Sequence, residues 1–133
     1  MGHVLYKSIP IPKDPSYFSK DVTVIIPTIQ DDMEKLRVPV SSILATGIHT
    51  LIMVTQCHNY CALKGFATSI RDSRIKLCSS VVANKRCQLY NAIRLVDTPI
   101  TVLVDDDVTW PPGINPWILA PFEDKDMGSV GVC

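Results

Sequence analysis

Three consecutive aspartates, Asp105, Asp106 and Asp107, are the residues whose type and spacing most clearly suggest chemistry. They follow an apolar, β-branched segment, residues 100–104, that predicts a strand buried on both faces. Strand alternation would put Asp105 and Asp107 on one side and Asp106 on the other. Adjacent carboxylates repel one another, and a hard divalent cation such as Mg²⁺ or Mn²⁺ would relieve that repulsion. We therefore predict a metal site held by Asp105 and Asp107, with a solvated turn as the alternative.

Two basic residues, Lys85 and Arg86, begin a predicted helix, where the helix dipole disfavours cations. A nearby anion would offset that cost. A diphosphate held by a cation at Asp105 and Asp107 would meet the same need. Taken alone, the basic pair is better interpreted as a solvated turn.

The bulk composition indicates one globular domain without a strong charge bias. The chain has 133 residues, 47% of them hydrophobic, and 13 basic residues balance 13 acidic ones. Zero net charge argues against a broad nucleic-acid surface or a polybasic membrane patch. No window reaches the roughly 18 uninterrupted apolar residues of a spanning helix, and the start lacks a secretory core. We expect a soluble, cytoplasmic chain without a membrane segment.

Five cysteines, most of them within apolar segments, fit a reducing compartment. Cys57, His58 and Cys61 could supply half of a zinc site. No matching second pair follows, so ordinary buried or surface thiols are the favoured interpretation.

The elements that must position the aspartates follow an alternating pattern. Residues 1–20 contain three prolines among polar residues and predict an extended lead-in, with one domain following over residues 21–133. In that domain, short apolar runs alternate with helical periodicity, which predicts an α/β fold: a mostly parallel sheet with helices on both faces. The predicted strands are residues 22–27, 50–55, 75–79 and 100–104, and the predicted helices are residues 38–46, 59–70 and 83–96.

The segment after the aspartates, residues 109–122, is rich in proline and predicts a shaped loop leading to a short helix. Residues 129–133 look like the beginning of another strand. Its partners would lie further along the chain, so the sheet is expected to be truncated and to keep an exposed edge.

Ligands of parallel sheets bind beyond the carboxyl ends of the strands. All polar candidates therefore converge on one edge of the predicted sheet. The sequence has neither GxGxxG nor GxxxxGK[ST], so dinucleotide and P-loop interpretations lose their main support. The strand ends carry Pro27 and Thr28, Thr55 and Gln56, and Asp105 to Asp107.

Three segments together resemble the family 2 glycosyltransferases, and most closely their fungal polysaccharide-synthase group. They are DVTVIIPT at the first strand, ANKR before a helix, and VLVDDDV at the last strand. The resemblance runs from about Asp21 to Cys133. It implies the GT-A fold, an α/β domain that binds a nucleotide-diphosphate sugar, with a DxD motif that holds a divalent cation on the donor diphosphate.

The resemblance also implies roles for individual residues. Pro27 and Thr28 would flank the nucleoside, and Lys85 would approach the base or the phosphates. The DxD motif would put Asp105 and Asp106 at the nucleotide sugar. Its outer carboxylates, Asp105 and Asp107, would bind Mn²⁺ or Mg²⁺. The implied reaction is inverting transfer of a hexosyl group, with a UDP-sugar as the expected donor and a polysaccharide or glycan as the acceptor.

Two departures from the family pattern affect this prediction. The acidic residue that commonly ends the second strand is replaced by Thr55, Gln56 and Cys57. The acceptor-side general base, the QxxRW-type motif and the membrane helices of the family's synthases would lie after Cys133. Loss of a general base typically costs roughly 10² to 10⁴ in rate. No catalytic residue is therefore assigned.

These departures leave alternatives to the glycosyltransferase prediction. One is a noncatalytic fragment or remnant that at most binds nucleotide. Another is an unrelated Mg²⁺-dependent phosphoryl-transfer domain, with Asp106 as its acid or nucleophile. If the chain belongs to a full-length synthase, its expected location is the cytoplasmic face of a membrane.

Overall fold

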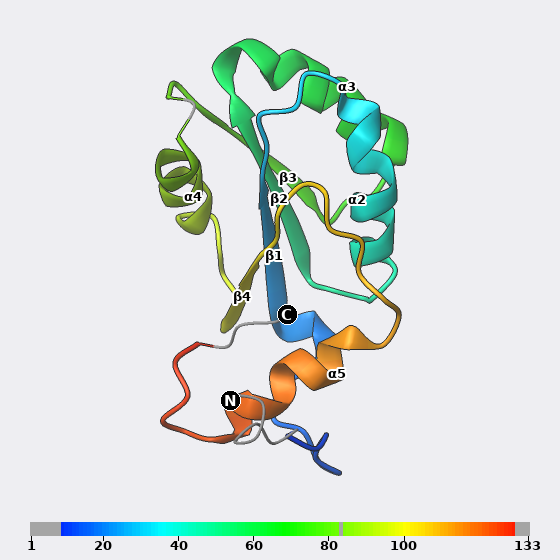
Figure 1. Cartoon of the computed structure of the whole chain (residues 1–133), viewed down its shortest axis with the longest axis vertical. Helices are drawn as coiled ribbons and strands as arrows, with labels where there is room; N and C mark the ends of the chain where they lie inside the picture. The colour runs from blue at the N-terminus through cyan, green and yellow to red at the C-terminus, as the bar shows by residue number, and fades with distance from the viewer. Residues whose placement is uncertain (1–8, 83, 130–133) are drawn as a thin grey trace, which may run out of the picture.

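The computed structural model describes residues 9–82 and 84–129. Its centre is a parallel sheet with the strand order β3-β2-β1-β4 (Figure 1). Parallel neighbours require crossover connections, which here contain the helices. The predicted α/β class is confirmed. The strands are β1 (Val22–Pro27), β2 (Thr50–Gln56), β3 (Ile75–Ser80) and β4 (Ile100–Leu103).

Helices cover both faces of the sheet, as predicted. In Figure 1, α2 and α3 lie on one face and α4 on the other. The α-helices are α2 (Arg37–Leu44), α3 (Tyr60–Ile70), α4 (Lys85–Ile93) and α5 (Ile114–Leu119). The short 3-10 helices are η1 (Ser19–Asp21), η2 (Met33–Leu36), η3 (Cys57–Asn59) and η4 (Ala120–Glu123).

Alternate residues of the central strands point into two separate hydrophobic clusters. Ile26 and Met53 belong to the larger cluster, which also contains side chains of α2 and α3. Ile25 and Ile52 belong to the smaller cluster beneath α4. Because both faces of β1 and β2 are buried, these strands are apolar at consecutive positions rather than at every second one.

Two helices end earlier than their apolar patterns predict. Helix α2 ends at Leu44, and Gly47 then takes a left-handed conformation with φ of 79°. Helix α4 ends at Ile93 rather than at residue 96. Val96 still packs against the small cluster, because a tight turn follows the helix: its N–H donates to the carbonyl of Ile93 at 3.2 Å. The apolar spacing therefore continued beyond the helix itself.

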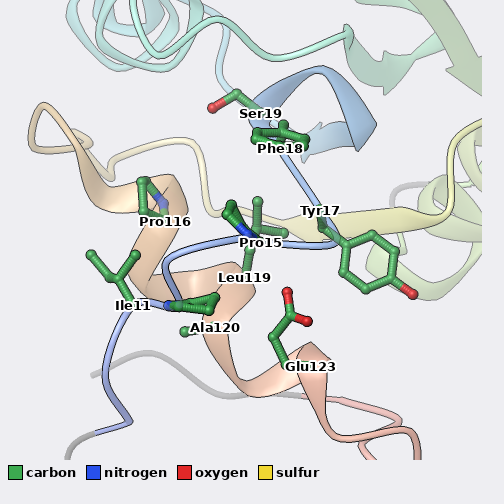
Figure 2. Close-up of a pocket in the computed structure, with 10 residues that line it drawn as sticks. Ile11, Pro15, Tyr17, Phe18, Ser19, Pro116, Leu119, Ala120 and Glu123 are labelled. Carbon is green, nitrogen blue, oxygen red and sulfur yellow. The ribbon is translucent and has the colours of Figure 1, made fainter.

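The described part of the lead-in packs against the segment that follows the aspartates. The backbone N–H and the hydroxyl of Ser16 donate to the Glu123 carboxylate at 2.6 and 2.8 Å. The rings of Tyr17 and Phe122 meet edge to face, with centroids 6.5 Å apart. Figure 2 shows the small apolar cavity, about 110 Å³, that lies between the lead-in and α5.

Two sequence predictions fall partly outside the described residues: the first eight residues of the lead-in, and residues 130–133 of the proposed final strand. Within residues 9–82 and 84–129, no helix has the length and apolar character needed to cross a bilayer.

Candidate functional site

The strand order reverses at β1, beside the carboxyl ends of β1 and β4. From β1 the chain proceeds through β2 to β3 on one side, and β4 then returns to the other side of β1. Ligands of open α/β sheets bind at such a reversal of strand order. Thr28 follows β1, and the three aspartates follow β4 shortly after its end. Thr28 and the three aspartates therefore lie at this reversal of strand order.

A hydrogen bond joins the segment that follows β1 to the segment that follows β4. The Thr28 hydroxyl donates to Oδ2 of Asp106 at 2.7 Å. The same hydroxyl oxygen accepts the backbone N–H of Gln30 at 3.0 Å. Thr28 is 2% exposed, and its N–H donates to the carbonyl of Val54 at 2.9 Å. The hydroxyl is therefore fixed in direction by its neighbours, and Asp106 is its acceptor.

Lys85 forms the second contact across the site. Its Nζ lies 2.5 Å from Oδ1 of Asp105, and the two side chains are 59% and 62% exposed. Solvent screens so exposed a pair, which contributes about 0–1 kcal/mol. The pair brings the first turn of α4 to the aspartates, where the Asn84 side chain caps the helix by accepting the N–H of Arg86 at 2.8 Å. Lys85 and Asp105 are therefore neighbours, as the candidate site requires.

The aspartates lie in a turn, which corrects the expectation from strand alternation. Strand β4 ends at Leu103, and the Val108 N–H then donates to the Asp105 carbonyl at 3.3 Å. The side chains of Asp105 and Asp107 are exposed, whereas Asp106 is half-buried. Aspartate favours turns because its side chain can replace backbone hydrogen bonds. The turn, rather than the pleat of a strand, sets the directions of these carboxylates.

The outer carboxylates suit a hard divalent cation in donor type. Mg²⁺ is commonly bound by one or two carboxylates, with water and substrate phosphate completing its ligands. Asp105 and Asp107 are exposed oxygen donors of that kind. In the part of the chain that the structure describes, no three His, Cys, Asp or Glu side chains are grouped to hold a metal ion.

Gln88 is a residue of this site that sequence reasoning missed. It lies one turn after Lys85 on α4 and is 2% exposed. Its Nε2 donates to the carbonyl of Thr28 at 3.1 Å. The available signal was a glutamine on the apolar face of a helix, beside Leu89 and Ala92, where a polar side chain needs a partner.

At the end of β2, where the resemblance leads us to expect an acidic residue, the chain has Thr55, Gln56 and Cys57. Thr55 is fully buried, and its hydroxyl is without a hydrogen-bond partner among the described residues. Gln56 is half-buried, and Cys57 is exposed at the start of η3. Pro27 is buried at the end of β1, paired in register with Val54. Its ring is therefore buried rather than free at the surface.

The cysteines of the described residues are free thiols. Cys57, Cys61 and Cys87 are exposed, whereas Cys78 packs against the cluster beneath α4. Burial raises the pKa of the Cys78 thiol above its ordinary value. This thiol is therefore neutral at physiological pH and contributes to packing.

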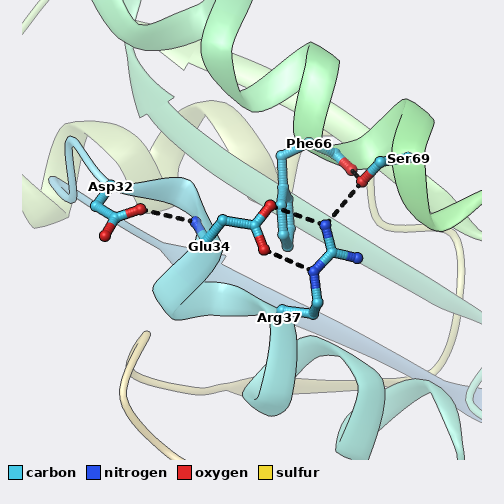
Figure 3. Close-up of polar contacts among 5 residues, drawn as sticks. All are labelled: Asp32, Glu34, Arg37, Phe66 and Ser69. Atoms are coloured by element: carbon cyan, nitrogen blue, oxygen red, sulfur yellow. Dashed lines mark hydrogen bonds and ion pairs between the residues drawn. The ribbon is translucent and has the colours of Figure 1, made fainter.

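A shallow groove lies between η2 and α3, next to the loop that follows β1. Figure 3 shows Arg37 at this groove, paired with both oxygens of Glu34 at 2.8 and 2.9 Å. Arg37 also donates to Ser69 at 3.1 Å and lies over the Phe66 ring. Its hydrogen bonds hold the pKa of Glu34 below the ordinary value. Arg37, the first residue of α2, thereby links η2 and α2 to α3.

Neither this groove nor the cavity of Figure 2 is lined by Thr28, Lys85 or the aspartates 105–107. The cavity instead belongs to the contact between the lead-in and α5.

Comparison with known proteins finds fungal relatives. A type 2 glycosyltransferase of Pyricularia oryzae is 50% identical over 132 residues, which cover 99% of this chain and 27% of that protein. A type 2 glycosyltransferase of Gibberella zeae is 47% identical, covering 100% of this chain and 25% of that protein. An NDP-glycosyltransferase of Aspergillus luteorubrus is 33% identical, covering 94% and 31% respectively. The chain thus spans about a quarter to a third of the length of these relatives.

A solved structure shares the fold. The 4-diphosphocytidyl-2C-methyl-D-erythritol synthase of Anaerococcus prevotii superposes with a TM-score of 0.57 at 12% identity. The match covers 66% of this chain and 44% of that one. It supports the Rossmann-like α/β architecture. The family described as "Glycosyltransferase like family 2" has a sequence model that matches residues 20–133. This match confirms the resemblance found in the sequence, and the chain belongs to that family.

Proposed function

We propose that this chain is the donor-binding part of a glycosyltransferase that takes a nucleotide-diphosphate sugar, with a UDP-sugar as the first candidate. The observation that carries the proposal is that the ends of β1 and β4 and the start of α4 meet at one place. The Thr28–Asp106 bond joins the ends of β1 and β4, and the Lys85–Asp105 pair adds the start of α4. The Aspergillus relative is named an NDP-glycosyltransferase, which supports a nucleoside-diphosphate donor.

In this proposal the nucleoside lies against the end of β1, beside Pro27 and Thr28. Asp105 and Asp106 face the nucleotide sugar, and Asp105 and Asp107 hold Mn²⁺ or Mg²⁺. The cation would offset the charge of the diphosphate as the nucleoside diphosphate leaves. Together these groups would stabilise the leaving group electrostatically.

Lys85 has a role that depends on its exposure. Its ammonium pairs with Asp105 here, but the pair is open to solvent and weak. A bound diphosphate offers Lys85 several anionic oxygens in place of one carboxylate. Exchange of partners would free Asp105 for the cation and place the ammonium on the phosphates. The Lys85–Asp105 pair would thus break when the donor binds.

The acceptor in this proposal is a polysaccharide or another glycan. Its hydroxyl would attack the anomeric carbon from the face opposite the departing diphosphate, which inverts the configuration. We assign no general base within this chain. Cytoplasmic location, and attachment to the cytoplasmic face of a membrane in a full-length synthase, belong to the same proposal.

Calorimetric titration of the folded chain with UDP, with and without Mn²⁺, tests the donor site. GDP serves as the comparison nucleotide, and circular dichroism establishes that the protein is folded. We expect binding that requires Mn²⁺ and favours UDP. Absence of heat with every nucleotide, in protein shown to be folded, would refute the donor-site assignment. Equal binding of GDP would refute only the choice of uridine.

A transfer assay separates catalysis from simple nucleotide binding. Release of UDP from a UDP-sugar, in the presence of Mn²⁺ and an oligosaccharide, measures turnover. If the chain binds UDP but releases none from any donor tested, the noncatalytic alternative gains support.

A further inference from the structure

The amide of Gln88 occupies an unusual position for a polar side chain. It is 2% exposed and projects from α4 beneath the candidate site. Burying an amide without partners is costly, so its hydrogen bond determines where it lies. That bond runs from Nε2 to the backbone carbonyl of Thr28 at 3.1 Å. Gln88 therefore restrains the peptide group that immediately follows β1.

Thr28 connects this restraint to Asp106. Its hydroxyl donates to Oδ2 of Asp106 at 2.7 Å and accepts the N–H of Gln30 at 3.0 Å. The direction of the hydroxyl depends on the backbone of Thr28, and Gln88 holds that backbone by its carbonyl. We call the chain of hydrogen bonds from Gln88 through Thr28 to Asp106 the relay.

The relay fixes the middle aspartate of the turn. With Oδ2 of Asp106 held toward β1, the turn that contains all three aspartates is anchored by its centre. Asp105 and Asp107 then remain exposed on either side of the anchor. The helix that supplies Gln88 also supplies Lys85. One helix, α4, therefore positions both the aspartate turn and the Lys85 ammonium that pairs with Asp105.

We propose that Gln88 is a positioning residue for the donor site, which acts through Thr28 to set the carboxylates of the aspartate turn. The assignment rests on the proposed donor function for its consequences in binding. The relay itself is a property of the ligand-free protein. Partners that orient metal ligands typically matter by about 10-fold or more in metal affinity.

The first measurement uses the ligand-free chain, so it does not depend on the proposed function. Gln88→Met keeps the volume of the side chain but removes the N–H donor. In ¹H–¹⁵N NMR spectra, we expect it to shift the amide resonances of Gln30 and of the aspartate turn, because the Thr28 carbonyl loses its side-chain donor and the backbone that carries the hydroxyl is less restrained. Unshifted resonances at Gln30 and Asp106 would overturn the proposal.

Asn91→Leu is the matched control. Asn91 lies on the same helix, and its Nδ2 also donates to a strand carbonyl, that of Ser79 at 3.3 Å. Strand β3 carries none of the aspartates, so this change should leave the turn resonances in place. If Asn91→Leu shifts them as much as Gln88→Met does, a general loosening of α4 explains the effect and the proposal fails.

Binding of Mn²⁺ and UDP then tests the consequence for the site. We expect Gln88→Met to weaken the Mn²⁺-dependent affinity for UDP about 10-fold, while Asn91→Leu retains it. In a Thr28→Val background, where the relay is already cut, Gln88→Met should add little further loss. An equal additional loss in that background would overturn the route through Thr28.

The two proposals fail in different ways. If the parent chain does not bind UDP while the relay resonances still respond to Gln88→Met, the donor function fails and the relay stands. If UDP binds and both Gln88→Met readouts are unchanged, the relay fails and the donor function stands. Should Gln88→Met not fold, Gln88→Asn, which keeps the amide but shortens its reach, is measured in the same way.

Discussion

Thr28 and Asp106 are separated by 78 positions in the sequence, yet the hydroxyl of Thr28 donates a 2.7 Å hydrogen bond to the Asp106 carboxylate. The bond connects the ends of two adjacent parallel strands at the point where the strand order reverses. This contact links the fold of the chain to its candidate chemistry, because Asp106 lies between the two proposed metal ligands, Asp105 and Asp107.

Removing the Thr28 hydroxyl should destabilise the protein. In Thr28→Val the half-buried Asp106 carboxylate loses a donor, and a hydrogen bond to a charged group is worth about 1.5–3 kcal/mol when well buried. Because Asp106 keeps some contact with water, we expect a loss of about 1–2 kcal/mol in the free energy of unfolding. Urea denaturation measures it. Thr28→Ser, which retains the hydroxyl, should stay closer to the parent, and equal losses in both variants would point to packing instead.

Asp107→Ala should abolish the Mn²⁺-dependent binding of nucleotide without affecting folding. The carboxylate is exposed, so its removal should change the free energy of unfolding by no more than about 0.5 kcal/mol. Titration calorimetry with Mn²⁺ and UDP gives the affinity, and thermal melting gives the stability. Asp97→Ala removes another exposed carboxylate as the control. An Asp107→Ala protein that binds as tightly as its parent would remove Asp107 from the metal site.

Lys85→Ala should weaken the binding of UDP but leave the binding of Mn²⁺ alone intact. The ammonium is proposed to contact the phosphates, and its removal also releases Asp105 from the ion pair. We therefore expect a weaker affinity for UDP together with an unchanged or slightly tighter affinity for Mn²⁺. Titrations with each ligand separate the two effects. Lys76→Ala, an exposed position on β3, is the control. Identical UDP affinity in both variants would exclude Lys85 from the site.

Acid should destabilise the fold partly through Asp72. Hydrogen bonds from the Arg74 side chain, at 2.7 and 3.0 Å, hold the pKa of Asp72 below its ordinary value. A carboxyl whose folded pKa is depressed adds stability above its unfolded pKa, and that stability is lost as the pH falls through the folded value. The loss should therefore begin as the pH falls toward about 4 and continue below it.

Asp72→Asn tests this pH dependence. We expect the variant to be less stable than the parent at pH 7, by about 1 kcal/mol since the pair is partly exposed. The difference should shrink toward pH 3, because the unfolded Asp72 carboxyl binds a proton before the folded one does. Urea denaturation at both pH values provides the comparison, and Asp126→Asn, an exposed position, is the control. A difference that stays constant with pH would show that the ion pair is not its source.

The sequence by itself determined which segments form the elements and which residues follow the strands. Apolar runs predicted each strand to within a residue of its observed bounds. Strands β1 and β2 are buried on both faces, whereas β4, which was expected to be, is an outer strand whose Leu103 is exposed. The motif around the aspartates and the two other matching segments also sufficed to identify the family, which the family comparison then confirmed. These properties are local, so a linear pattern can carry them.

Only the tertiary structure decided how those residues meet. Alternation predicted directions for the aspartates, but the chain leaves the strand at Leu103 and turns, so the pattern no longer applied. Gln88 resembled a helix residue of no special interest until the fold placed its amide on the carbonyl of Thr28. The reason is physical: strand order and contacts between distant residues depend on the packing of the whole core, which no local spacing encodes.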